Sequence, residues 1–197
     1  MALEAVLLPT GDLGPLPLER LAHPRCEATP HPGGLTQLAL SGELPGDWTV
    51  RLTRALAARG ISLVEGYARR FQGDLWISLL LLDPGYAAGP LPNFLALATE
   101  PWDSPIPSTP RLLDFDLAES AALGGSLRLE VHAWDAIGLL ATVLERAGGA
   151  GLHPEELLLE TEGECAFHSV VLRGAGGTAP AAGARRRLER ELERLLG

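Results

Sequence analysis

The chain has 197 residues, a formal net charge of −9, and 16 basic residues, all of them arginine. This acidic balance argues against nonspecific binding to nucleic acid, which needs a basic surface. The lack of lysine excludes a Schiff-base enzyme, a Walker phosphate loop and a lysine nucleophile. No apolar run approaches the ~20 residues that span a bilayer, and no secretory leader opens the chain. We therefore expect a cytoplasmic protein without a membrane partner.

The first half of the chain predicts alternating strands and helices. Residues 35–41 can form a strand, and Glu43, Pro45 and Gly46 form the turn after it. The elements that follow are an amphipathic helix at 47–59, a strand beginning near Ser62, a strand at 75–82, a short helix at 93–99 and a strand at 111–117. We expect the strand at 111–117 to be the fourth strand of this first copy.

The same order of elements returns about 90 residues later, which indicates a tandem duplication. The elements of the second copy are a strand at 127–134, a helix at 139–147, a strand beginning near His153, a strand at 165–172 and a helix at 180–196. No fourth strand follows that last helix. We predict that residues 3–8 complete the second sheet from the N-terminus, or that the strand is missing.

The turn between the first strand and helix of the second copy reads Asp135-Ala136-Ile137-Gly138, and Leu139 and Leu140 begin the helix. A glycine at such a turn allows a small ligand to come close, and the helix start offers free N–H groups to an anion. A carboxylate, and hence an amino acid, fits this site. Two simpler readings stay open: Asp135 caps the helix, and Gly138 only permits close packing.

These features resemble the ACT domain, a small regulatory module. The resemblance rests on the order of strand, D-x-x-G-L-L, helix, G-[LI]-x-x, strand, glycine turn and strand. With two such copies, the chain is similar to stand-alone tandem-ACT proteins of the glycine-cleavage repressor type. It implies an α+β fold of two ferredoxin-like βαββαβ domains, whose antiparallel sheets carry helices on one face. It also implies that an amino acid binds at the interface between paired domains.

The proline- and glycine-rich stretches between the predicted elements set the predicted domain limits. Residues 1–34 form an N-terminal segment, 35–120 the first ACT-like domain, 121–126 a linker and 127–197 the second ACT-like domain. Many family members carry a ligand-binding asparagine where this chain has His153, and Ser62 takes that place in the first copy. The candidate ligand-binding residues are Asp135, Ala136, Ile137, Gly138, Leu139, Leu140 and His153, with Glu43, Pro45, Gly46 and Ser62 in the first copy.

No sequence pattern points to catalysis or to a metal. His23, Cys26 and His31 lie close together in what we predict to be an exposed loop, but they lack a fourth zinc ligand and a regular spacing. We therefore expect no catalytic residue, no cofactor and no metal. The predicted function is a non-catalytic homodimer that binds an amino acid and signals to a separate effector protein. The alternative is a ligand-free assembly module with a decayed pocket.

Overall fold

The computed structural model describes residues 22–85, 90–101, 105–106, 109–121 and 124–197. Its strands are β1 (Arg25–His31), β2 (Leu35–Glu43), β3 (Ser62–Arg70), β4 (Leu75–Asp83), β5 (Leu112–Ser120), β6 (Ser126–Trp134), β7 (His153–Glu162) and β8 (Cys165–Arg173). Its α-helices are α1 (Trp48–Ala57), α2 (Phe94–Thr99), α3 (Leu139–Gly149) and α4 (Ala184–Glu193). Short 3-10 turns lie at Pro32–Gly34 and Ala175–Gly177.

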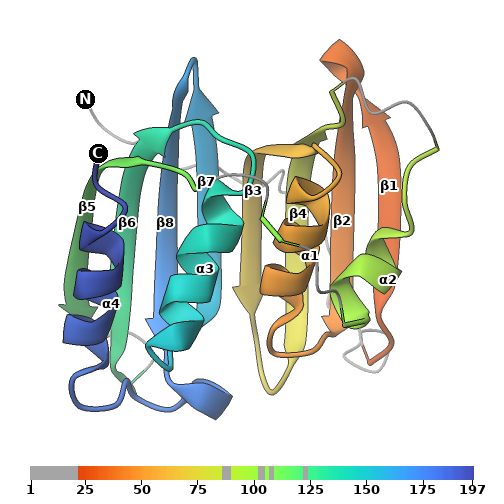
Figure 1. The fold of residues 1–197 in the computed structure, drawn as a ribbon. Helices are drawn as coiled ribbons and strands as arrows, with labels where there is room; N and C mark the ends of the chain where they lie inside the picture. The colour runs from red at the N-terminus through yellow and green to blue at the C-terminus, as the bar shows by residue number, and fades with distance from the viewer. Residues whose placement is uncertain (1–21, 86–89, 102–104, 107–108, 122–123) are drawn as a thin grey trace.

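The eight strands form one antiparallel sheet in the order β1-β2-β4-β3-β7-β8-β6-β5 (Figure 1). The first half of this sheet belongs to β1–β4 and the second half to β5–β8, and β3 pairs with β7 where they meet. Each half has the ferredoxin-like strand arrangement with two helices. The predicted α+β class, with two ferredoxin-like units, is confirmed. In both units, however, the outer edge strand comes first in the chain instead of last.

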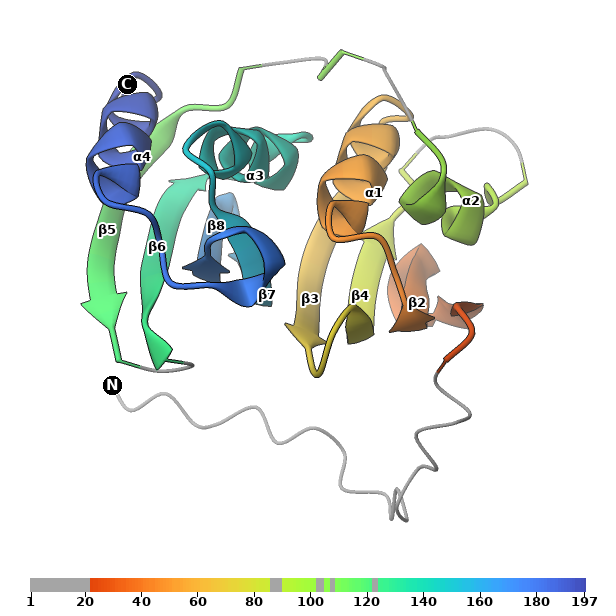
Figure 2. The same cartoon turned by 90° about the horizontal axis from the view of Figure 1, so that it is seen from below.

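The four described α-helices cover the same face of the sheet, and none of them lies on the other face (Figure 2). Strand residues alternate accordingly: in β4, Trp76 and Leu80 are buried beneath the helices, whereas Leu79 points to the uncovered face. Trp76 meets Trp48 of α1 edge to face, with ring centroids 5.4 Å apart. Both tryptophans are fully buried, whereas Trp134 is 51% exposed. None of the described helices is long and apolar enough to span a membrane.

The predicted fourth strand of the first copy lies in the other half of the molecule. It corresponds to β5, which pairs with β6 through partners such as Leu117 and Leu129. The predicted boundary between 35–120 and 127–197 is therefore wrong, because β5 belongs to the second half, and Ser126 of the predicted linker is already the first residue of β6. The physical reason is that a short connection between consecutive strands favours a hairpin. The alternating pattern shows that a strand exists but does not choose its partner.

The edge strand of the first half, β1, comes from the segment that we predicted to be irregular. All seven of its residues are exposed, and Pro30 interrupts it, so the sequence shows no apolar alternation there. Exposure and proline are typical of an edge strand. The predicted strand at residues 3–8 lies outside the described residues. Among the described strands, β5 completes the second half of the sheet, at its outer edge beside β6.

Candidate functional site

The candidate site lies where the two halves of the sheet meet. Antiparallel pairing of β3 with β7, through partners such as Gly66 and Leu159, places the start of β3 beside the β6–α3 turn. A pocket of about 30 Å³ forms there. Its lining residues are Ser62 and Leu63 from the first half, and Asp135, Ala136, Leu139, Leu140 and His168 from the second. This volume accommodates about one water molecule.

The β6–α3 turn is held by backbone contacts. The N–H of Asp135 donates to the carbonyl of Glu164 at 2.8 Å, and the N–H of Leu139 donates to the carbonyl of Ala136 at 3.0 Å. Gly138 is the N-cap residue of α3 and adopts a left-handed backbone with φ of 93°. No side chain caps this helix, so the reading of Asp135 as a helix cap is wrong. Asp135 lies four residues before Leu139, the first helical residue, and Gly138 occupies the N-cap position.

The carboxyl group of Asp135 is a perturbed acid. Partial burial raises its pKa above the usual value, and a hydrogen bond from the backbone of Ala136 opposes that rise only in part. Asp135 is one of the residues that line this junction pocket. A carboxylate in this position attracts a cationic group, such as the ammonium group of an amino acid.

Gly138 is in close contact with Ile106, which precedes the second half. A Cβ added at Gly138 would lie 2.5 Å from Cγ2 of Ile106 and 3.6 Å from Cβ of Ala57. The left-handed φ also disfavours any side chain at this position. Of the two readings of Gly138, the contact with Ile106 therefore favours close packing. Ligand approach over this glycine requires Ile106 to move.

His168 on β8 is a member of the pocket that sequence reasoning missed. Its residue is 6% exposed, and burial lowers its pKa to about 4, so the imidazole is neutral near pH 7. Its Nδ1 atom is buried and has no hydrogen-bond partner among the described residues. A signal for it exists in the sequence: His168 alternates with the apolar Ala166 and Val170, which makes it a polar residue on the buried face of its strand.

The first copy does not reproduce the carboxylate. The N–H of Leu44 donates to the carbonyl of Asp74 at 3.0 Å, which matches the bond that Asp135 makes in the second copy. Leu44 therefore takes the place of Asp135. The structure brings together five of the predicted residues, namely Ser62, Asp135, Ala136, Leu139 and Leu140. The remaining predicted residues do not line this pocket, namely Glu43, Pro45, Gly46, Ile137, Gly138 and His153.

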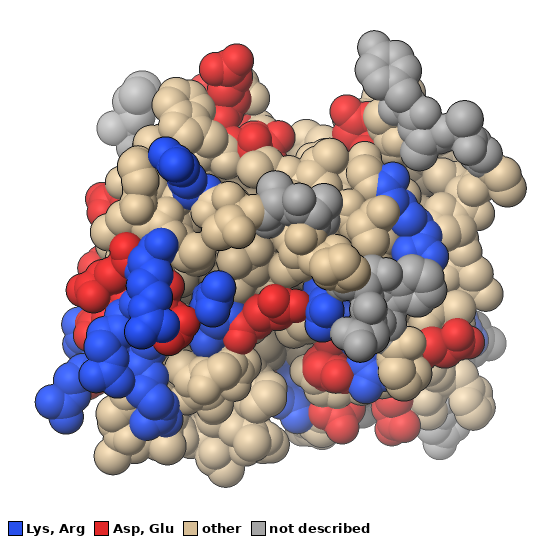
Figure 3. Space-filling view, in the orientation of Figure 1, with Lys and Arg blue, Asp and Glu red and all other residues tan. Residues whose placement is uncertain are grey.

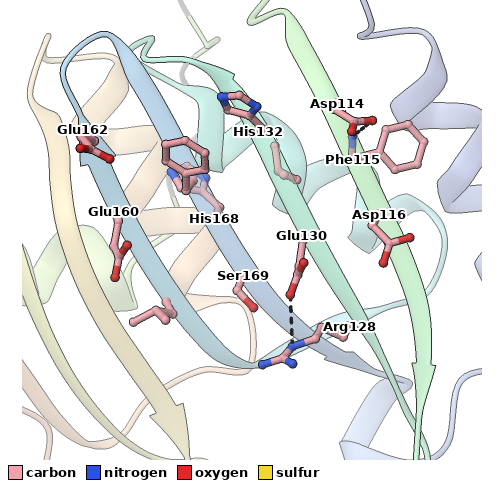
Figure 4. A pocket seen from close by; sticks show the side chains of 13 residues that line it. Asp114, Phe115, Asp116, Arg128, Glu130, His132, Glu160, Glu162, His168 and Ser169 are labelled. Carbon is pink, nitrogen blue, oxygen red and sulfur yellow. Dashed lines mark hydrogen bonds and ion pairs between the residues drawn. The ribbon is translucent and has the colours of Figure 1, made fainter. Parts of the chain in front are cut away.

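A larger hollow of about 530 Å³ lies on the uncovered face of the second half (Figure 4). Within it, His132 and Phe167 stack with ring centroids 4.5 Å apart and planes 13° from parallel. One guanidinium group, of Arg128, lies 3.8 Å from a carboxylate oxygen of Glu130. Five carboxylates line the hollow, namely Asp114, Asp116, Glu130, Glu160 and Glu162. This concentration of negative charge disfavours phosphate groups at the face where a related sheet topology stacks RNA bases.

Metal ligands do not gather in the described part of the chain. No group of three or more histidine, cysteine, aspartate or glutamate side chains there has a geometry that holds a metal ion. Cys26 and His31 lie at separate positions along β1, beside Leu40 and Leu35 of β2. The prediction that they lie in a loop is wrong, because the strand continues from Arg25 to His31.

Comparison with known proteins adds one structural similarity. No model of a known protein family matches the chain, and no curated protein matches it. Among solved structures, the chain is similar to the aspartate kinase of Synechocystis, with a TM-score of 0.47 and 15% sequence identity. The alignment covers 82% of this chain and 26% of the kinase. The chain thus spans about a quarter of that enzyme, and a similarity of this degree assigns no function.

Proposed function

We propose that this protein is a non-catalytic regulatory protein that binds an amino acid at the junction pocket. The observation that carries the proposal is that Ser62 and Asp135, from different halves, line one pocket together with the unpartnered Nδ1 of His168. In this proposal the Asp135 carboxylate receives the ammonium group. The start of α3 offers N–H groups to the ligand carboxylate.

The position of the pocket provides a route from binding to regulation. A ligand that touches both halves favours the arrangement of the halves in which all its contacts are made. Because we expect no catalytic residue on this chain, the output goes to a separate effector protein. We also propose that the protein is a cytoplasmic homodimer without a nucleic-acid partner. The exposed edge strand β1 offers unpaired backbone groups to a second copy.

The size of the pocket requires it to open. A volume of about 30 Å³ is far below the roughly 300 Å³ or more of typical small-molecule pockets. Ile106 packs over Gly138, the residue directly before Leu139 of the pocket lining, and we propose that its displacement makes room for the ligand. In this proposal the bound and free states differ in the position of Ile106.

The alternative is a ligand-free assembly module, and two observations favour it. The pocket is closed, and the first copy has Leu44 where the second has Asp135. In that case the duplicated sheet serves to bind another protein. The two functions differ in whether any small molecule stabilises the fold.

A thermal-shift screen against the twenty amino acids separates the two functions. The proposed sensor is stabilised by one of them, by roughly 3 kcal/mol at a hundredfold excess over the dissociation constant. Asp135→Asn should abolish that shift, while Asp114→Asn, on the uncovered face, should leave it intact. A flat panel from a folded protein, or an equal loss in both variants, rejects the sensor.

A further inference from the structure

Positive charge gathers at one place on this acidic protein. Figure 3 shows arginine side chains concentrated over α4, at the end of the molecule where the second half lies. Between α3 and α4 there is a groove of about 480 Å³. Its charged lining residues are Glu145, Arg146, Arg187, Arg190, Glu191 and Arg194. The groove is separate from the junction pocket, with which it shares no lining residue.

Helical spacing explains how the arginines reach the groove. Arg187 and Arg190 of α4 and Arg194 at its C-cap are three and four residues apart, so they form one stripe along the helix and its end. Arg146 lies on α3, on the opposite side of the groove. Three arginines of one helix therefore converge with one of its neighbour. Arg185, which does not line the groove, is ion-paired within the helix, with its Nε 2.9 Å from Oε1 of Glu189.

The two carboxylates of the groove leave part of this charge uncompensated. Glu145 pairs with Arg54 of α1 at 3.0 Å, and Glu191 is shared between Arg146 and Arg194. Arg187 donates to the carbonyl of Ala150 at 3.0 Å, which fixes the guanidinium at the end of α3.

Two guanidinium groups thus remain without an acidic partner. Within the described residues, neither Arg187 nor Arg190 has a carboxylate within ion-pair distance. Two neighbouring guanidinium groups without a counter-charge repel each other, and an anion between them removes that repulsion. The observation that matters is therefore a pair of arginines without acidic partners that lines an open groove, with Arg187 held in place by the carbonyl of Ala150.

We propose that this groove binds a phosphate-bearing small molecule. Arginine presents planar pairs of N–H donors that match the oxygens of a phosphoryl group. The groove has the volume of a small-molecule site, and six of its eight lining residues are charged, which fits a phosphorylated polar metabolite. Arg187 and Arg190 hold the phosphoryl group, and the rest of the ligand lies over Gly149. An extended nucleic acid fits poorly, because the chain as a whole is acidic.

Calorimetric titration of the full-length protein with inorganic pyrophosphate at low salt tests this site. Arg190→Gln removes one unbalanced charge and should weaken binding at least tenfold. Arg186→Gln removes the same charge from the same helix outside the groove, and it should change affinity less than twofold. No binding by the wild type, or equal weakening by both variants, overturns the proposal, because equal weakening indicates a nonspecific effect of charge.

A second pair of variants tests the space of the groove without changing charge. Open space lies above both Gly148 and Gly149, which are neighbours in α3, but only Gly149 lines the groove. Gly149→Leu should abolish pyrophosphate binding, and Gly148→Leu should preserve it. Malonate provides the chemical control, since it carries two carboxylates in place of phosphoryl groups. Equal affinity for malonate rejects the phosphate assignment, and so does unchanged pyrophosphate binding by Gly149→Leu.

Discussion

Arg70 and Glu155 form a largely buried ion pair that joins the two halves of the molecule. The guanidinium Nη1 lies 2.9 Å from Oε1 of Glu155, and the side chains are 12% and 8% exposed. Arg70 ends β3 and Glu155 lies near the start of β7, the two strands that meet at the junction. Arg70 also contacts Asp74 at 3.0 Å. This network lies at the ends of β3 and β7 that are remote from Ser62.

Breaking this pair should destabilise the protein strongly. Arg70→Met leaves the Glu155 carboxylate buried without its partner, and loss of one member of such a pair typically costs about 3–5 kcal/mol. Urea unfolding, followed by circular dichroism, measures the change. The exposed pair between Arg185 and Glu189 provides the control, because Arg185→Met should cost less than about 1 kcal/mol.

The double variant Arg70→Met/Glu155→Leu refines this prediction. It removes both charges, so it should recover much of the stability that the single variant loses. A single variant as stable as the wild type contradicts the importance of the pair. A double variant no better than the single one indicates that Arg70 acts mainly through its contact with Asp74.

Gly138 should tolerate no side chain. Gly138→Ala forces a residue into a left-handed backbone at φ of 93° and places its Cβ 2.5 Å from Ile106. We expect a loss of about 2 kcal/mol in the free energy of unfolding. Gly148→Ala, in the open part of α3, should instead stabilise the protein by about 0.5 kcal/mol.

Combining Gly138→Ala with Ile106→Ala separates the two causes of that loss. A partial recovery of stability shows that the contact with Ile106 contributes, whereas no recovery assigns the loss to the backbone. If Gly138→Ala costs nothing, the glycine is not required for packing, and a role in ligand approach is supported.

The elements were easier to predict than their partners. The strand at 75–82 and the helix at 139–147 follow from apolar periodicity, and both are present as β4 and α3. Periodicity carries no information about pairing, so β5 was assigned to the wrong half. The edge strand β1 was missed because none of its residues is buried.

The candidate site shows the same division between local and distant relationships. The turn at Asp135 is a local motif, and the sequence indicates it. His168 joins that turn only through the fold, and Arg70 meets a partner 85 residues away. Contacts between distant segments depend on the order of strands in the sheet, which a single sequence leaves open.

His168 should make the protein sensitive to mild acid. Its pKa is lowered to about 4 in the folded state, below the usual 6.5, because burial disfavours the charged imidazole. Stability is therefore fully present above about pH 6.5 and is lost as the pH falls toward 4, since only the unfolded chain takes up the proton readily. The loss is about 3 kcal/mol over this range.

A comparison of two histidine variants tests this assignment. His168→Gln should flatten the curve of unfolding free energy against pH between 6.5 and 4. The exposed His31, changed to Gln in the same way, should leave the curve parallel to that of the wild type. Identical slopes in the wild type and His168→Gln contradict the assignment.

Asp135 should have the opposite effect to His168: it should lower the stability of the folded protein as the pH rises. Its folded-state pKa is raised by burial, so the folded protein disfavours the charged carboxylate. The resulting destabilisation is absent at pH values below the unfolded pKa and develops as the pH rises through the folded pKa.

Asp135→Asn removes the charge while keeping an oxygen that accepts from Ala136. The variant should therefore be slightly more stable than the wild type at pH 7 and equal to it near pH 3, as measured by thermal unfolding. A variant less stable at pH 7 means that the carboxylate makes a stabilising contact in the folded state, and the burial argument then fails. Because the same variant should lose the amino-acid response, a gain in stability at pH 7 makes any lost response a loss of binding rather than of folding.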